Sequence, residues 1–281
     1  MSSNSLGVTV LLLALSACAP SFVDEPWLVT APRILAITAE PPEVAPGGTA
    51  TLTAIVSGEG SLGWSRCDVS RPLAQNESVS VACLASARAA PEGALTFTLT
   101  VPAQACARFG PEVASAGDRP RDPDASGGWY QPVGASFDGA LVFAFERLTC
   151  APANVSAEVA SAFRLARAPN HNPVIGLTAQ VEGTPVELGS LPMDREVELV
   201  PTLEAPEPYV LIDPATLTLS SAVETQETSW FVTAGTLSRA STRAAPTGWH
   251  APAEPGTGTL WVVARDSRGG LGVLVRAISW R

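Results

Sequence analysis

The stretch that decides the fold lies at residues 49–57 and reads Thr49-Ala50-Thr51-Leu52-Thr53-Ala54-Ile55-Val56-Ser57. Threonine alternates along it with Leu52, Ala54 and Val56, so that one face is polar and the other is apolar. A period of two residues is typical of a β-strand with one buried face. A second strand pattern at residues 33–40 precedes it, across a turn rich in proline and glycine. The two patterns together predict a fold that is built on short strands.

Similar strand patterns continue to the C-terminus and fall into two regions. The segment between the regions, Pro169-Asn170-His171-Asn172-Pro173, is polar and has proline at both ends, which predicts a fairly stiff, extended linker. We therefore expect an all-β chain with a first domain at residues 32–168, a linker at residues 169–173 and a second domain at residues 174–281. Each domain then has an ordinary size for a single hydrophobic core.

Two segments resemble the immunoglobulin-like domains of bacterial proteins. The turn Pro46-Gly47-Gly48-Thr49 and the strand after it are similar to the opening of such a domain. The pattern W-x-A-P-x-x-P-G-T…L-W-V-V-A-R-D-S-R-G-G, at residues 249–270, resembles the last strands of PKD-type and other immunoglobulin-like domains. The resemblance implies two tandem immunoglobulin-like β-sandwiches, and it places Trp64 in the core on a third strand. Trp230 and Trp261 also lie within strand patterns and are expected in a core.

One segment fits two local structures equally well. Residues 155–167 carry apolar side chains at a spacing of about four residues, which is typical of an amphipathic helix. The same residues also fit a loop that leads into a short strand. The sequence leaves both interpretations open.

The N-terminal segment carries a second resemblance. Residues 6–17 are almost wholly apolar, and the run is too short to span a bilayer as a helix. It ends in Leu15-Ser16-Ala17-Cys18, which resembles the lipobox of bacterial lipoproteins. The resemblance implies a signal peptide at residues 1–17, a lipidated Cys18 that begins the mature chain, and a lipidated tether at residues 18–31. The alternative is an ordinary cleaved signal peptide with a chance cysteine. Residues 1–5 depart from the family pattern, because they lack the Lys or Arg that usually precedes the apolar region.

If Cys18 carries lipid, four cysteines remain: Cys67, Cys83, Cys106 and Cys150. An even number of cysteines in an exported protein favours disulfides, and their spacing is not that of a zinc site. Among the three possible pairings we expect Cys67–Cys83 and Cys106–Cys150. The second bridge would clamp the base of residues 110–128, a segment rich in Pro, Gly, Asp, Arg and Ser that predicts a long loop.

The composition argues against several functions. The chain has 27 acidic residues against 17 basic ones, which gives a net charge of −10 and disfavours binding to nucleic acid. It contains neither a G-x-S-x-G nor an H-E-x-x-H motif, and its two histidines, His171 and His250, lie far apart in turn-like segments. We therefore expect a protein that is not an enzyme and that uses no cofactor.

Two groups of residues are weak candidates for a binding site. Asp122, Asp124 and Ser126 resemble the start of a calcium loop, although a solvated acidic turn explains the same pattern. The aromatic residues Trp129, Tyr130 and Trp249 flank turns, where they either stack on a ligand or pack beneath a loop.

The sequence as a whole predicts a non-catalytic, lipid-anchored protein of the cell envelope that presents β-sandwich domains for adhesion, assembly or partner binding. Its membrane attachment is the lipid on Cys18, and Ala19 favours the outer membrane by similarity to the family's sorting pattern. The alternative is an accessory component of an envelope enzyme or transport system that binds carbohydrate or a protein. The expected partners are the membrane and an envelope protein or glycan.

Overall fold

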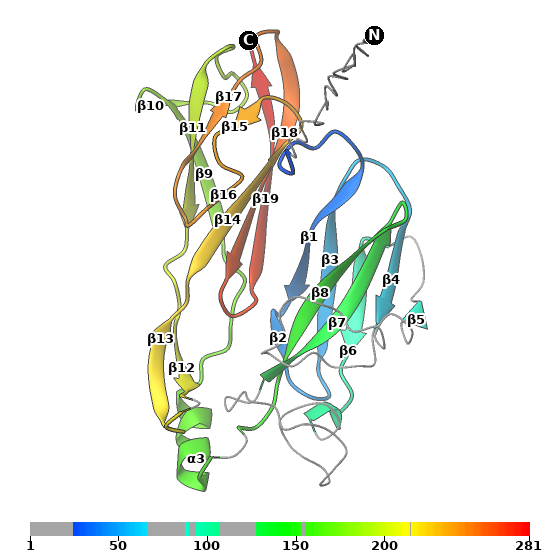
Figure 1. The fold of residues 1–281 in the computed structure, drawn as a ribbon, viewed down its shortest axis with the longest axis vertical. Coiled ribbons are helices and arrows are strands. Elements are labelled where there is room, and N and C mark those ends of the chain that lie inside the picture. Colours follow the sequence, from blue (N-terminus) through cyan, green and yellow to red (C-terminus); the bar gives the residue numbers. More distant parts are fainter. Residues whose placement is uncertain (1–24, 67–87, 90–93, 107–127, 153–154, 214) are drawn as a thin grey trace, which may run out of the picture.

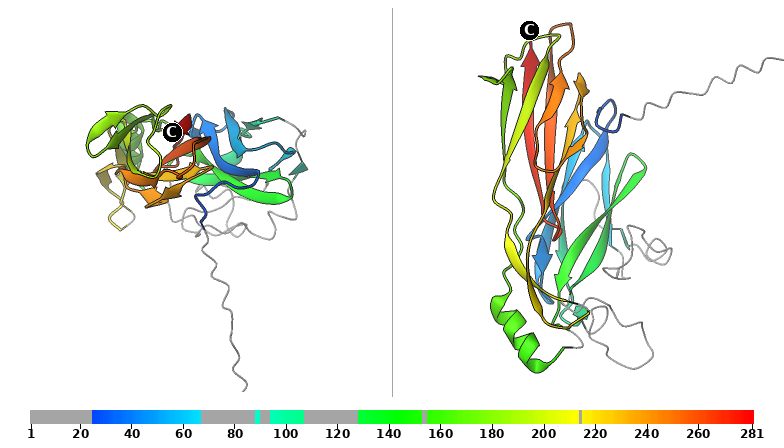
Figure 2. Two further views of the ribbon diagram at one scale, coloured as in Figure 1. Left: turned by 90° about the horizontal axis from the view of Figure 1, so that it is seen from above. Right: turned by 60° about the vertical axis from the view of Figure 1, so that its left-hand side comes forward.

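The computed structural model describes residues 25–66, 88–89, 94–106, 128–152, 155–213 and 215–281. Strands dominate these residues, as the alternating patterns predict (Figure 1). They form two β-sandwiches that lie side by side, with the first sandwich displaced toward one end of the molecule (Figures 1 and 2). The prediction of an all-β chain with two sandwiches is confirmed.

The first sandwich consists of a three-stranded and a five-stranded sheet. The smaller sheet has the order β1-β3-β6, formed by Arg33–Glu40, Thr49–Ser57 and Thr96–Thr100. The larger sheet has the order β2-β8-β7-β4-β5, formed by Glu43–Val44, Ala140–Thr149, Gly128–Phe137, Leu62–Arg66 and Arg88–Ala89. In immunoglobulin notation the smaller sheet is A-B-E and the larger one is G-F-C-C′, with β2 added beside strand G.

The alternation of residues 49–57 decides which face of β3 is buried. Ala50, Leu52 and Ala54 are buried between the two sheets, while Thr49 and Thr51 point to solvent. Trp64 occupies the core from strand β4, the position on strand C that is typical of immunoglobulin-like domains. Its indole N–H donates to the carbonyl oxygen of Ala94 at 2.9 Å, so the buried nitrogen is satisfied.

The second sandwich repeats the same topology. One sheet has the order β10-β9-β11-β17-β15, formed by Thr184–Val186, Ile175–Val181, Glu196–Leu203, Thr247–His250 and Thr236–Leu237. The other has the order β16-β14-β18-β19, formed by Ser241–Thr242, Gln226–Val232, Gly256–Asp266 and Leu271–Trp280. The strands β9-β11-β17-β15 correspond to A-B-E-D, and β14-β18-β19 to C-F-G. Strand C again carries a fully buried tryptophan, Trp230.

An arm of two strands extends the second sandwich beside the first. Strands β12 (Pro208–Ile212) and β13 (Leu219–Val223) pair with each other. In the sequence they come between strands B and C of the second sandwich. Helix α3 (Ala157–Ala166) packs on this arm at the lower end of the molecule, where Phe163 and Ile212 are buried together (Figure 2). The helical interpretation of residues 155–167 is therefore the correct one, because the arm covers the apolar side of the helix.

The positions of three further tryptophans differ from what the sequence patterns predict. Trp249 is 0 % exposed in the core of the second sandwich, because β17 pairs between β11 and β15 and turns that residue inward. Trp261 is buried, but against Val29 and Leu35 between the two sandwiches rather than in a sandwich centre. Trp27, from the expected tether, fills part of the second core, and its carbonyl oxygen accepts from the amide of Val232 at 3.0 Å.

The cysteine predictions have different outcomes. Cys106 and Cys150 form a disulfide with an S–S distance of 2.05 Å and a Cα–Cα distance of 5.6 Å. This bridge joins the segment after β6 to the end of β8, as predicted. Cys67 and Cys83 lie outside the described residues, and so does the loop at residues 110–128, apart from Gly128, which begins β7.

Candidate functional site: a cleft between the two sandwiches

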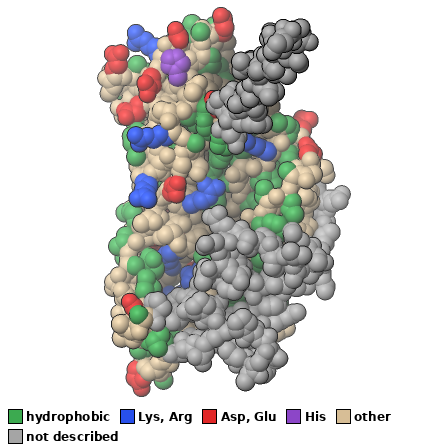
Figure 3. Space-filling model, viewed as in Figure 1, with side chains coloured by type: hydrophobic (Ala, Val, Ile, Leu, Met, Phe, Trp, Pro, Cys, Tyr) green, Lys and Arg blue, Asp and Glu red, His purple; other side chains and the backbone are tan. Residues whose placement is uncertain are grey.

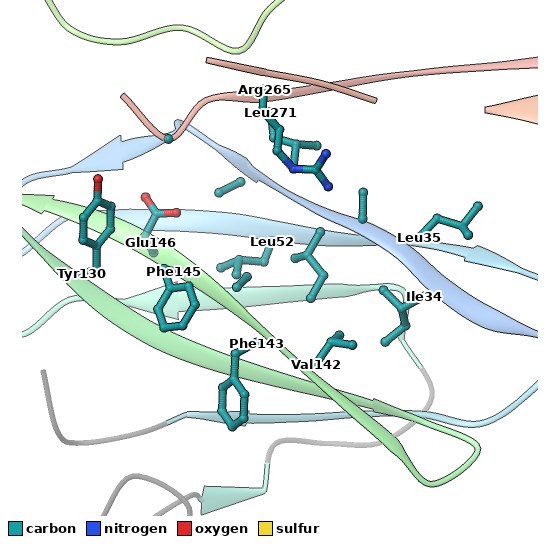
Figure 4. Close-up of a pocket in the computed structure, with 15 residues that line it drawn as sticks. Ile34, Leu35, Leu52, Tyr130, Val142, Phe143, Phe145, Glu146, Arg265 and Leu271 are labelled. Carbon is teal, nitrogen blue, oxygen red and sulfur yellow. The ribbon is translucent and has the colours of Figure 1, made fainter. Parts of the chain in front are cut away.

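The candidate site is a cleft on one side of the first sandwich. It lies where β1 and β8 form the margins of their two sheets, and the β18–β19 hairpin of the second sandwich lines it on a further side (Figure 4). Its volume is about 650 Å³. Its lining comes from both sandwiches and consists of Ile34, Leu35, Ala36, Ile37, Ala39, Leu52, Tyr130, Val142, Phe143, Ala144, Phe145, Glu146, Arg265, Gly269 and Leu271.

The cleft follows from how the strands of the first sandwich pair. Strand β2 covers the margin of β8 only at Arg147 and Leu148, so the part of β8 before Arg147 has no partner on that side among the described strands. Strand β1 pairs with β3 and carries an irregularity between Ile34 and Ala36. The two sheets are therefore not bridged along this side, and their apolar inner faces line an open space.

One acidic side chain points into this apolar space. Glu146 lies on β8, is 2 % exposed, and points into the cleft from the same strand that contributes Val142 and Phe143 (Figure 4). Neither of its carboxyl oxygens has a hydrogen-bond partner within the described structure. An ionised carboxylate without partners is very unfavourable in such surroundings, so the group is stable only when it is protonated or when a ligand supplies a charge.

The surroundings of Glu146 change its acidity accordingly. Burial raises the pKa of Glu146 from 4.5 to about 8, and the negative charges of Glu43 and Glu40 act in the same direction. At neutral pH the carboxyl group is therefore mostly protonated. A binding partner with a positive charge would reverse this balance, because it would stabilise the carboxylate.

Other polar and aromatic groups complete the cleft. The rings of Tyr130 and Phe145 lie at the same end as Glu146 (Figure 4). Arg265 reaches the cleft from β18, donates from Nη1 to Ser229 Oγ at 3.0 Å, and points its guanidinium away from Glu146 (Figure 4). The acid and the base thus lie at separate positions of one apolar cleft.

A buried network holds the two sandwiches around the cleft. Glu43 is buried, and Arg147 Nη1 donates to its Oε2 at 3.0 Å, while Arg167 Nη2 donates to its Oε1 at 2.5 Å. The backbone amide of Asn170, in the predicted linker, donates to the same Oε1 at 2.9 Å. Glu43 therefore ties a strand of the first sandwich to the linker, and its charge is paired.

The linker also determines the position of the hairpin that closes the cleft. Asn172 Nδ2 donates to the carbonyl oxygen of Ala39 at 2.7 Å, and its Oδ1 accepts from the amide of Leu271 at 2.8 Å. Asn170 Nδ2 donates to the carboxylate of Asp266 at 3.3 Å. These bonds connect β1 of the first sandwich with the β18–β19 hairpin of the second, so the two walls of the cleft are held in register.

The candidates from the sequence fall in different places. Tyr130 lines the cleft, whereas Trp129 and Trp249 are buried in the two cores and offer no ring face to a ligand. Cys18 and the candidate calcium residues Asp122, Asp124 and Ser126 lie outside the described residues.

Sequence reasoning missed Glu146, although a signal was available. Val142, Ala144, Glu146 and Leu148 lie two residues apart along β8, so a glutamate occupies a position of the inward-facing, apolar pattern. A charged residue at an inward-facing position of a strand is rarely buried without a partner, so Glu146 is a candidate for a functional role.

The two histidines form separate surface pairs. His171 Nδ1 lies 2.6 Å from Glu207 Oε1, and His250 Nε2 lies 3.3 Å from Asp194 Oδ1. Figure 3 shows acidic side chains and a histidine gathered at the upper end of the second sandwich. Among the described residues, no group of three His, Cys, Asp or Glu side chains is arranged to hold a metal ion. No described helix has both the length and the apolar character needed to cross a membrane.

Comparisons with known proteins add little to this geometry. The sequence matches no protein-family model and no curated protein. Similar solved structures include the Yersinia pseudotuberculosis adhesin InvE, at 8 % identity over 88 % of this chain and 58 % of that one, with a TM-score of 0.20. Invasin, a bacterial integrin-binding protein, has 8 % identity over 88 % of this chain and 39 % of its own, with a TM-score of 0.21. The C-terminal domain of the Streptococcus pyogenes antigen I/II-family protein AspA has 8 % identity over 90 % of this chain and 99 % of its own, with a TM-score of 0.19.

These similarities are too weak to support a function. This chain spans less than two thirds of InvE and of invasin, and every TM-score is about 0.2. The immunoglobulin-like topology rests instead on the order of the strands and on the tryptophan that each strand C carries.

Proposed function

We propose that this protein is a non-catalytic, lipid-anchored component of the cell envelope that binds a partner at the cleft between its two sandwiches. The observation that carries the proposal is the cleft itself, an apolar space with one buried acid, lined by both sandwiches. Concave apolar sites with few polar groups, located between domains, are the usual form of a binding site. The lipobox-like segment Leu15-Ser16-Ala17-Cys18 supports the anchoring.

The hydrogen bonds of Glu43, Asn170 and Asn172 hold the two sandwiches in a fixed arrangement, which favours a binding role over a flexible pair of domains. A partner that contacts both walls would meet surfaces that are already held in place by Glu43, Asn170 and Asn172. Such preorganisation lowers the entropic cost of association. The alternative of carbohydrate binding through exposed aromatic rings has less support, since Trp129 and Trp249 are buried.

The anchoring is tested by metabolic labelling of cells with a palmitate analogue. The parent protein should take up label and fractionate with the outer membrane, because acyl chains on Cys18 would hold it there. The Cys18→Ser variant should lose the label and appear in the soluble fraction. Label in both proteins, or in neither, would contradict the anchor.

The binding role is tested by cross-linking in cells. A photoreactive residue replaces Leu141, which is 49 % exposed beside Val142 of the cleft, or Leu165, which is 87 % exposed on α3, as the control. We expect a specific cross-linked product from position 141 only. The product should disappear when Ala144→Trp fills the cleft, and identical products from both positions would exclude the cleft as the binding surface.

A further inference from the structure

We infer that the cleft is a binding site for a primary ammonium group carried on an apolar body, and that Glu146 is the residue that binds the ammonium. The inference deepens the proposed binding role and rests on it for the location of the site. Its chemistry comes from three observations: an unpartnered buried carboxyl group, the aromatic rings beside it, and the apolar walls that extend away from it.

The buried carboxyl group requires a positively charged partner. Glu146 lies in the cleft with both oxygens unpartnered in the described structure, and the nearby Glu40 and Glu43 add negative potential. An ammonium group supplies up to three N–H donors and a compensating charge, whereas a neutral hydroxyl supplies one donor and no charge. A cation therefore gains more from this position than a neutral group of the same size.

The aromatic rings favour the same kind of ligand. Tyr130 and Phe145 line the cleft at the end that contains Glu146 (Figure 4). The face of an aromatic ring attracts a cation, and the attraction is stronger where water is excluded. An ammonium bound by Glu146 would thus lie at the end of the cleft that the two rings line.

The remaining walls describe the rest of the ligand. Ile34, Ile37 and Leu52 from one sheet line this space together with Val142 and Phe143 from the other. The volume of about 650 Å³ lies within the range of sites for small organic ligands, which is about 300–1,000 Å³. An aliphatic or aromatic body of modest size fits this space, as does the apolar end of a peptide with a free amino group.

Binding should be linked to proton release. The charged or titratable groups around Glu146 are Glu40 on β1, Glu43 on β2, Tyr130 on β7 and Arg265 on β18. Because the pKa of Glu146 is raised to about 8, the free protein holds a proton there at pH 7. An ammonium ligand must displace this proton, so its affinity should rise about tenfold per pH unit between roughly pH 5.5 and 7.5.

The test is calorimetric titration of the full chain with Cys18→Ser, which can be purified without detergent. The probes share one body: hexylamine, hexanol and hexanoate. We expect hexylamine to bind at a ratio of one to one, at least tenfold more tightly than hexanol or hexanoate. At pH 7 its heat should differ between buffers with different ionisation enthalpies, since a proton is released.

Two variants and one control assign the site. Glu146→Gln should weaken the binding of hexylamine at least tenfold and abolish the dependence of the binding heat on the buffer. Ala144→Trp should weaken the binding of all three probes, because it fills the cleft. Glu198→Gln, an identical change on the exposed face of β11, should change nothing. If a variant does not fold, the buffer dependence of the binding heat in the parent chain still shows whether binding releases a proton.

A leucine-rich tripeptide with a free or an acetylated amino terminus distinguishes the possible sources of the ammonium. Tighter binding of the free peptide than of hexylamine would identify a peptide terminus as the source, and the reverse would identify a small amine. Equal affinity for hexylamine and hexanol, tighter binding of hexanoate, or no binding at all would overturn the inference. None of these failures would change the palmitate or cross-linking results, so the proposed function is tested separately.

Discussion

At the scale of single residues, two buried glutamates of the first sandwich have opposite roles. Glu43 receives hydrogen bonds from two arginines and a backbone amide, so its charge is compensated and it joins parts of the chain. Glu146 is also buried, yet neither oxygen has a partner in the described part of the chain. A compensated charge contributes to the structure, whereas an uncompensated one costs stability and is a candidate for function.

Glu146 should make stability depend on pH in a specific direction. Its pKa in the folded protein, about 8, lies above the value of 4.5 for an exposed glutamate, so the folded state binds the proton more tightly. Its contribution to the free energy of unfolding is therefore fully present below about pH 4.5 and is lost as the pH rises to about 8. At 1.36 kcal/mol per pKa unit, the loss is at most about 5 kcal/mol.

Urea denaturation between pH 5 and 9 measures this effect. Glu146→Gln has no group to titrate, so its stability should fall less than that of the parent chain over this range. Glu198→Gln serves as the control and should follow the parent. Parallel curves for the parent and Glu146→Gln would show that burial does not hold the proton on this side chain.

At the scale of elements, the alternating strands behave as their sequences predict, and the differences occur where another element covers a surface. Strand β3 buries its apolar face, and both strands corresponding to C bury a tryptophan. Residues 155–167 become helical because the arm of β12 and β13 covers their apolar side at Phe163. The sequence alone left this segment undecided, since neither the helix nor a strand has a core within the segment itself.

At the scale of the whole molecule, the linker is a rigid connection between the two sandwiches rather than a flexible hinge. Its two asparagines bond to β1, to Glu43 and to the hairpin of the second sandwich. Trp27 adds a further connection, because a residue that precedes the first sandwich packs in the core of the second. The two sandwiches should therefore unfold as a coupled pair.

Glu43→Gln tests this coupling. Glutamine removes the negative charge that faces Arg147 and Arg167, and breaking a buried ion pair typically costs about 3–5 kcal/mol. We expect calorimetry to show one cooperative transition for the parent and a lower, broader or divided transition for the variant. Glu204→Gln, at an exposed position, should melt as the parent does. A single unchanged transition for Glu43→Gln would contradict the role of this network.

The sequence by itself determined the strands, the two sandwiches, the core positions of Trp64 and Trp230, and the Cys106–Cys150 bridge. The strands follow from a local period of two residues, the bridge was expected among three possible pairings, and the resemblance to immunoglobulin-like domains implied the sandwiches and the core position of Trp64. Only the tertiary structure decided the positions of Trp27, Trp249 and Trp261, the network of Glu43 and the position of Glu146 in the lining of a cleft. The physical reason is that each of these depends on which surface another part of the chain covers, and contacts between segments distant in sequence leave no local period.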